Sequence, residues 1–126
     1  RMRSSRAQGR RGEQLAERAL LREGYVILAR NLHFRHSELD LLGLDGKTLC
    51  FIEVRLRSSS AFGSAEESVS LRKQRRIVRA AREFLARTRP PRHDAMRFDV
   101  IAIDAGTDPP RVRLIRGAFT ADGPCG

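Results

Sequence analysis

The chain has 126 residues, of which 25 are basic and 15 acidic, and its formal net charge is +10 at pH 7. This length predicts a single domain with a core of its own, and no apolar run approaches the ~20 residues that a membrane helix needs. The first residues lack the apolar segment of a secretion signal, and two cysteines are too few for a disulfide framework or a four-ligand zinc site, so we expect a cytoplasmic protein.

Apolar periodicity predicts the element order α-β-β-β-α-β-β. The helices are expected at residues 10–23 and 71–87. The strands are expected at residues 25–29, 39–44, 48–56, 98–103 and 112–115. A meander of three strands, followed by the long helix as a crossover to a parallel fourth strand, makes an α/β domain with a mixed sheet flanked by helices.

The ends of the chain and one internal segment lack such periodicity. We expect a flexible basic segment at residues 1–9, one domain at residues 10–119 and a flexible tail at residues 120–126. The serine-rich residues 58–64 are expected to form a flexible loop before the long helix.

Carboxylates interrupt the apolar residues of the second and third strands. A tight turn at Asp45-Gly46 pairs residues whose numbers sum to about 91, which places Asp40 near Phe51 and Glu53 near Glu38. A carboxylate within an apolar strand is costly unless it is paired or binds a cation. Converging carboxylates in a strongly basic protein predict a site for a hard cation with oxygen ligands, Mg²⁺ or Mn²⁺.

A cation shares this predicted site. Glu53 and Arg55 are two residues apart on one strand, so they project from the same face. Acids, a metal ion and a cation together are the set that hydrolyses phosphodiesters. The alternative is a group of surface ion pairs in which Glu38 and Glu53 meet Arg55 and Arg57. A further acid, Asp99, lies in an apolar strand and is expected to pair with an arginine of the long helix.

The long helix presents a basic face that predicts contacts with phosphate. Arginine binds phosphate bidentately and keeps its charge at neutral pH, and only two of the 25 basic residues are lysines. This charge favours nucleic acid over an anionic membrane as the partner, although an arginine-rich, solvated surface would look the same. The small number of aromatic residues favours duplex or branched DNA over single strands. The candidate contacts are Arg72, Lys73, Arg75, Arg76 and Arg79.

Four segments together resemble a known family: GRRGEQLAERALLREGYVILARN, SELDLLGLDGKTLCFIEVRLR, VSLRKQRRIVRAAREFL and RFDVIAI. They resemble the YraN-like family of bacterial proteins, which belongs to the PD-(D/E)XK, restriction-endonuclease-like superfamily and is similar to the archaeal Holliday-junction resolvases. The resemblance covers residues 9–119. It implies a restriction-endonuclease-like fold and a nuclease that cuts DNA with Mg²⁺ or Mn²⁺.

The resemblance also assigns roles to individual residues. It maps Asp40 and Glu53 onto the two metal-binding acids and Glu13, at the border of the apolar face of the first helix, onto an additional helix acid. Arg55 stands where the motif has lysine, and this departure matters because arginine supplies charge but cannot lose a proton at neutral pH. Glu38 is a further candidate, preceded by serine where the family has glycine.

Two functions are therefore expected from the sequence. The first is a metal-dependent endonuclease acting on duplex or branched DNA, with Asp40, Glu53, Arg55 and Glu13 as catalytic residues. The second is a non-catalytic nucleic-acid-binding module on the same fold, with cleavage impaired by Arg55. Junction resolvases of similar fold act as dimers, so a homodimer is an expected assembly, whereas no membrane partner is expected.

Overall fold

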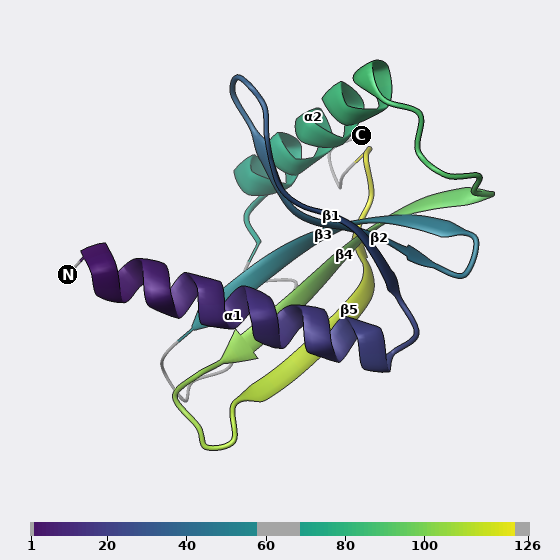
Figure 1. Cartoon of the computed structure of the whole chain (residues 1–126). Coiled ribbons are helices and arrows are strands. Elements are labelled where there is room, and N and C mark those ends of the chain that lie inside the picture. Colours follow the sequence, from purple (N-terminus) through teal and green to yellow (C-terminus); the bar gives the residue numbers. More distant parts are fainter. Residues whose placement is uncertain (1, 58–68, 123–126) are drawn as a thin grey trace.

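The computed structural model describes residues 2–57 and 69–122 (Figure 1). The two helices are α1 (Met2–Arg22) and α2 (Leu71–Arg87). The five strands are β1 (Val26–His33), β2 (Glu38–Asp45), β3 (Thr48–Arg57), β4 (Ala95–Asp104) and β5 (Arg111–Phe119). The predicted element order is thus confirmed. The loop expected at residues 58–64 and the last residues of the expected tail lie outside the described residues.

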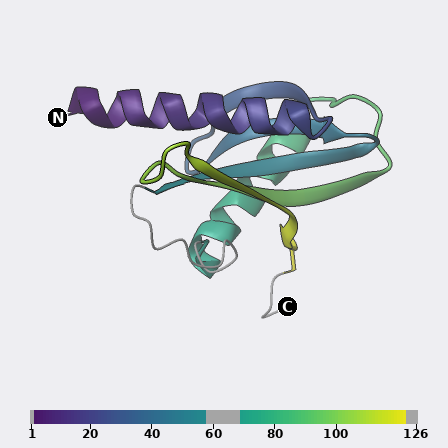
Figure 2. The ribbon, with the colours of Figure 1, turned by 90° about the horizontal axis from the view of Figure 1, so that it is seen from below.

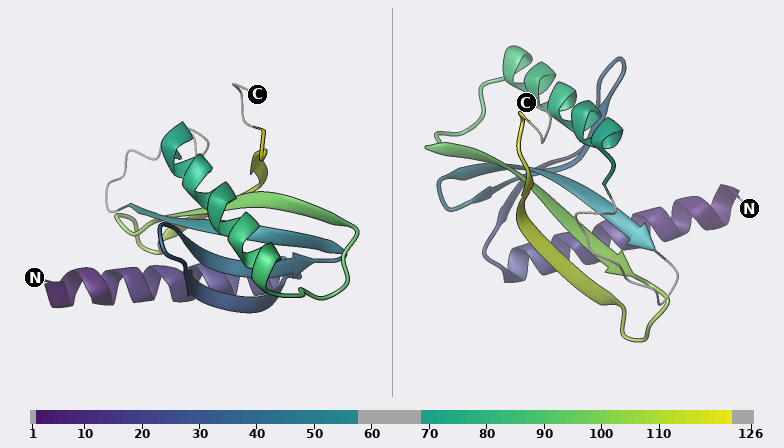
Figure 3. Two further views of the ribbon diagram at one scale, coloured as in Figure 1. Left: turned by 90° about the horizontal axis from the view of Figure 1, so that it is seen from above. Right: turned by 180° about the vertical axis from the view of Figure 1, so that it is seen from behind.

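The strands form one mixed sheet in the order β1-β2-β3-β4-β5. Among the described strands only β3 and β4 pair in parallel, and α2 is the crossover between them, as predicted. The helices lie on opposite faces of the sheet (Figures 2 and 3). This α/β architecture confirms the predicted class and is consistent with a restriction-endonuclease-like fold. No helix of the described chain is long and apolar enough to cross a membrane.

The pleat of β3 divides the core between the two helices. Ile52 packs with Leu20 in the cluster under α1, whereas its neighbour Phe51 packs with Phe84 in the cluster under α2. Successive side chains of a strand point to opposite faces. Glu53, two residues after Phe51, therefore lies on the face that α2 covers.

The turn between β2 and β3 differs from the predicted one by a single residue. Gly46 and Lys47 form the two-residue loop, since Asp45 pairs with Thr48. Gly46 has a φ of 61°, which a residue without a Cβ adopts at little cost in a hairpin turn. Paired residue numbers consequently sum to 93 rather than 91: Leu42, not Asp40, lies opposite Phe51.

The helix boundaries have local causes. α2 begins at the predicted residue because the Ser70 side chain accepts a hydrogen bond of 3.1 Å from the backbone N–H of Lys73, which caps the first turn. The backbone N–H of Thr88 donates to Phe84 at the other end. α1 begins earlier than predicted, at Met2, so the helical backbone also covers residues 2–9, where the sequence predicted no element.

Candidate active site

The structure brings the carboxyl groups of Asp40 and Glu53 together. Asp40 lies just beyond the last backbone pair of β2 and β3, Leu41 with Ile52. Its Oδ2 accepts a hydrogen bond of 2.8 Å from the backbone N–H of Val54, so the adjacent strand holds the carboxylate in place. Glu53 is only 5% exposed. The register thus brings two acids together, as the sequence predicted, but the neighbour of Glu53 is Asp40 and not Glu38.

Burial and repulsion disturb the ionisation of this pair. The pKa of Glu53 is raised from its ordinary 4.5 to about 8, first by loss of solvent, then by the charge of Asp40 and by a hydrogen bond between the two carboxyl groups. Lys73 and Arg55 act in the opposite direction. Burial and the neighbouring carboxylate thus both favour the protonated form of Glu53, as expected for two acids that cannot both ionise cheaply.

Two cations from different elements flank the same oxygen of Glu53. Arg55 Nη1 lies 3.9 Å from Glu53 Oε2, and Lys73 Nζ lies 3.8 Å from it. Arg55 comes from β3, where alternation predicted it, whereas Lys73 comes from the first turn of α2, whose position the Ser70 cap fixes. The helical pattern predicts Lys73 on the basic face of α2, whereas in the structure its ammonium group lies beside the acid pair.

The other two acids proposed for the site do not join the pair. Glu13 is half-buried on α1, which packs on the opposite face of the sheet from α2. Within the described part of the chain, no three His, Cys, Asp or Glu side chains lie close enough to hold a metal ion, so Glu13 does not complete a triad here. Glu38 faces β1, where it pairs with His33 at 3.3 Å. The expected contact between Glu38 and Glu53 was wrong because of the shifted register.

The donor set of Asp40 and Glu53 fits a hard divalent cation. Mg²⁺ is commonly bound through one or two carboxylates, with water and phosphate oxygens completing its shell. A divalent ion would also favour the ionised form of Glu53, whose pKa burial and the charge of Asp40 raise, because metal ligands bind in their deprotonated form. The half-buried Arg55 and Lys73 leave positive charge beside the pair for a phosphate.

The exposed side of α2 keeps four of the five predicted phosphate contacts together. The four residues are Arg72, Arg75, Arg76 and Arg79. Their side chains are exposed and form no ion pair with the described residues. Like charges three or four residues apart repel one another on a helix. An anion bound along this face would relieve that repulsion.

Asp99 is buried, as expected for a structural acid, but its partner differs from the predicted one. Arg97, two residues earlier on β4, donates to both of its carboxylate oxygens, at 2.8 and 3.0 Å. Tyr25 donates at 2.7 Å and the backbone N–H of Gly117 at 2.9 Å. Arg97 also donates to Asp45 at 2.7 Å. These bonds keep the pKa of Asp99 below its usual range despite burial. The network joins the start of β1, the β2 end and β5.

Comparisons with known proteins place the chain among related sequences. Residues 12–103, which include every candidate site residue, match the family model described as "Uncharacterised protein family UPF0102". A UPF0102 protein of Anaeromyxobacter sp. (strain Fw109-5) is 45% identical over 118 residues, which cover 94% of this chain and 88% of the relative. A UPF0102 protein of Symbiobacterium thermophilum is 44% identical over 120 residues, or 93% of this chain and 99% of the relative.

Proposed function

This chain belongs to the uncharacterised protein family UPF0102, and we propose that it is a metal-dependent endonuclease that hydrolyses phosphodiester bonds of duplex or branched DNA. The observation that carries the proposal is the acid pair: the nearly buried Glu53 lies beside Asp40, its pKa is raised, and Arg55 and Lys73 flank one of its oxygens. Acids with strongly raised pKa values beside specific charged partners are candidates for functional groups.

Each residue of the pair has a chemical task in this proposal. Asp40 and Glu53 would hold Mg²⁺ or Mn²⁺, which when bound polarises a phosphoryl oxygen and lowers the pKa of water. The backbone N–H of Val54 orients Asp40 toward the site. Arg55 and Lys73 hold the phosphate and offset the negative charge that develops on it during attack.

The resemblance to the PD-(D/E)XK superfamily and to the junction resolvases supports the same function. Arg55 is its main departure, because an arginine replaces the motif's lysine. Lys73 reaches the same oxygen of Glu53 as Arg55 does, so an ammonium group is available at the site from α2. Of the two lysines among 25 basic residues, one therefore stands at the acid pair.

The exposed arginines of α2 supply the DNA contacts. Counterion release predicts a log–log slope of affinity against salt of about −4 to −5 for 4–6 neutralised phosphates. Arg55 also favours a second candidate function, a binding module without cleavage, because a guanidinium at the lysine position cannot act as a base. Acids beside a bound phosphate weaken binding, and so a pure binding module gains nothing from Asp40 and Glu53.

A cleavage assay separates the two functions. Supercoiled plasmid, linear duplex and a four-way junction are incubated with the protein in Mg²⁺, Mn²⁺ or EDTA, and products are resolved on gels. The endonuclease nicks at least one DNA in the presence of a metal ion, and Glu53→Ala abolishes the nicking. Glu17→Ala is the matched control, because Glu17 pairs with Arg30 away from the site. Equal binding by all three proteins without cleavage assigns the binding module instead.

A further inference from the structure

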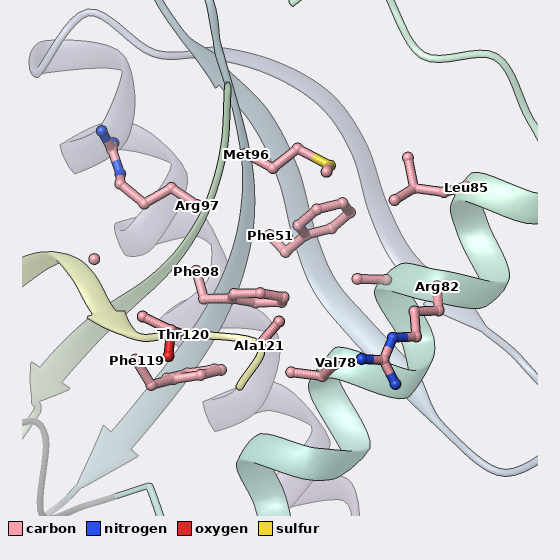
Figure 4. A pocket seen from close by; sticks show the side chains of 12 residues that line it. Phe51, Val78, Arg82, Leu85, Met96, Arg97, Phe98, Phe119, Thr120 and Ala121 are labelled. Atoms are coloured by element: carbon pink, nitrogen blue, oxygen red, sulfur yellow. The ribbon is translucent and has the colours of Figure 1, made fainter. Parts of the chain in front are cut away.

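A cleft lined by aromatic rings opens beside α2, in a part of the molecule with no assigned role so far. Its volume is about 360 Å³. Phe51, Phe98 and Phe119 form one wall, and Val78 and Leu85 of α2 form the other (Figure 4). Neighbouring ring centroids are 5.5 and 5.0 Å apart, and Phe98 and Phe119 are stacked.

The sheet register creates this cleft. β4 and β5 pair Phe98 with Phe119, and the parallel pairing of β3 with β4 brings Phe51 alongside Phe98. α2 packs mainly on β2 and β3. Phe51 and Phe98 are buried, whereas Phe119, at the end of β5, stays half-buried at the mouth of the cleft.

One residue that lines the cleft, Phe51, comes from the same strand as Glu53. Phe51 and Glu53 are two residues apart on β3 and point to the same face, so their Cα atoms are roughly 7 Å apart. This span is comparable with the separation between a phosphate and the base of an adjacent nucleotide. A strand whose phosphate lies at Glu53 can therefore place a base in the cleft.

The chemistry of the cleft suits a flat, uncharged ring attached to a polyanion. Its lining residues include no acid. Arg82 of α2 is exposed at its edge, whereas the guanidinium of Arg97 is held by Asp99 and Asp45 away from the cleft. Every nucleobase has a π-face that stacks on aromatic side chains, and the strand to which it belongs is attracted by the basic α2 surface.

We propose that this cleft binds an unpaired nucleobase of the DNA strand whose phosphate lies at Asp40 and Glu53. The inference rests on the proposed function and narrows its substrate to DNA with an unpaired or extruded base next to the cut. An intact duplex lacks such a base unless it bears the cost of unpairing and unstacking one. The preferred substrate is consequently branched or interrupted DNA rather than a continuous duplex.

Binding without cleavage tests the inference. Fluorescence anisotropy in EDTA measures the affinity of the protein for a continuous duplex, for the same duplex with one unpaired base, and for the same DNA with an abasic site in place of that base. The unpaired base should bind about 5- to 100-fold more tightly than the abasic site, since stacking on an aromatic side chain stabilises each base. 2-Aminopurine at the unpaired position should lose fluorescence on binding as it stacks.

Two variants link this preference to the cleft. Phe119→Leu keeps the apolar character but removes a ring at the mouth, and Val78→Phe fills the cavity; both should lose the preference and keep the affinity for duplex. Phe34→Leu is the matched control, because Phe34 is a partly buried ring of the same core outside the cleft. Circular dichroism establishes that each variant is folded.

The outcomes distinguish this inference from the proposed function. Absence of binding to any DNA overturns both. Equal binding to all three DNAs, or an equal effect of Phe119→Leu and Phe34→Leu, overturns the inference and leaves DNA binding intact. Sedimentation that shows a dimer for the natural protein but not for Phe119→Leu would assign the cleft to a second copy of the chain, which also overturns the inference.

Discussion

The raised pKa of Glu53 predicts how the stability of the protein changes with pH. Glu53→Gln removes a carboxyl group whose pKa is raised to about 8 from its ordinary 4.5. An acid that is harder to ionise in the folded protein stabilises it below its unfolded pKa. That contribution is lost as the pH rises through the folded pKa. The natural protein should therefore lose stability relative to Glu53→Gln between about pH 4.5 and pH 8 and remain lower above it.

The size of this loss follows from the difference between the two pKa values. A difference from 4.5 to about 8 corresponds to about 5 kcal/mol at most, at about 1.36 kcal/mol per unit. The steepest part of the curve should approach about 1.4 kcal/mol per pH unit. Asp45 and Asp99 do not contribute in this window, because their pKa values are lowered and their stabilisation is lost only at more acidic pH.

Urea unfolding in EDTA at pH 5.5, 6.5, 7.5 and 8.5 measures the effect. The quantity of interest is the difference in unfolding free energy between the two proteins, because the histidines are common to both and cancel. Glu17→Gln is the control for loss of a carboxylate elsewhere in the protein, because Glu17 pairs with Arg30 away from the site. Parallel curves for the natural protein and Glu53→Gln would refute the argument and show Glu53 to be an ordinary carboxylate ion-paired with Lys73 and Arg55.

Three further predictions concern the metal, the cations and the basic helix. Millimolar Mg²⁺ or Mn²⁺ should raise the melting temperature, because binding at ten times the Kd adds about 1.4 kcal/mol to the free energy of unfolding. Asp40→Asn should remove this rise, and a rise that persists in Asp40→Asn places the ion elsewhere. In gel assays of nicking, Arg55→Lys should raise the rate and Lys73→Ala should lower it about a hundredfold, whereas unchanged rates in both would show that neither cation touches the reacting phosphate. Replacing Arg75, Arg76 and Arg79 together by alanine should reduce the salt slope of DNA affinity by about 3; an unchanged slope in titrations at several salt concentrations would exclude this face as the DNA contact.

The order of the elements was predictable because each core element carries its own pattern. α2 repeats apolar residues at helical spacing, begins after a capping serine and ends before Pro90 and Pro91, and its predicted limits were confirmed. β1 and β5 are longer than predicted, ending at His33 and Phe119. Both are edge strands with alternating or polar residues, so the apolar run that marks a central strand stops before the backbone pairing does.

Long-range partners could not be predicted from local patterns. Asp99 was expected to pair with an arginine of α2. In β4, however, the side chains of Arg97 and Asp99 lie on the face of the sheet that α1 covers, where Tyr25 also lies. Opposite charges two residues apart on a strand share a face, which was the available signal for this pair. The contribution of Asp45 was hidden because its sequence context, Asp-Gly, is typical of a turn.

The acid pair was predictable from the local sequence, whereas the position of Lys73 beside it was not. Asp40 and Glu53 lie on consecutive strands, so any tight turn near Gly46 brings them within a few residues of each other, and a shift of two in the register keeps every side chain on its face. Because of this shift the carboxylate next to Glu53 is Asp40 instead of Glu38, and two carboxylates still lie together at the site. Lys73 has no such local link, because a crossover helix separates it from β3 and its position depends on where α2 begins. In the proposed reaction the effect of arginine at the motif position therefore depends on both cations together: Arg55 keeps the positive charge but cannot lose a proton, whereas the ammonium group of Lys73 lies 3.8 Å from the same oxygen of Glu53.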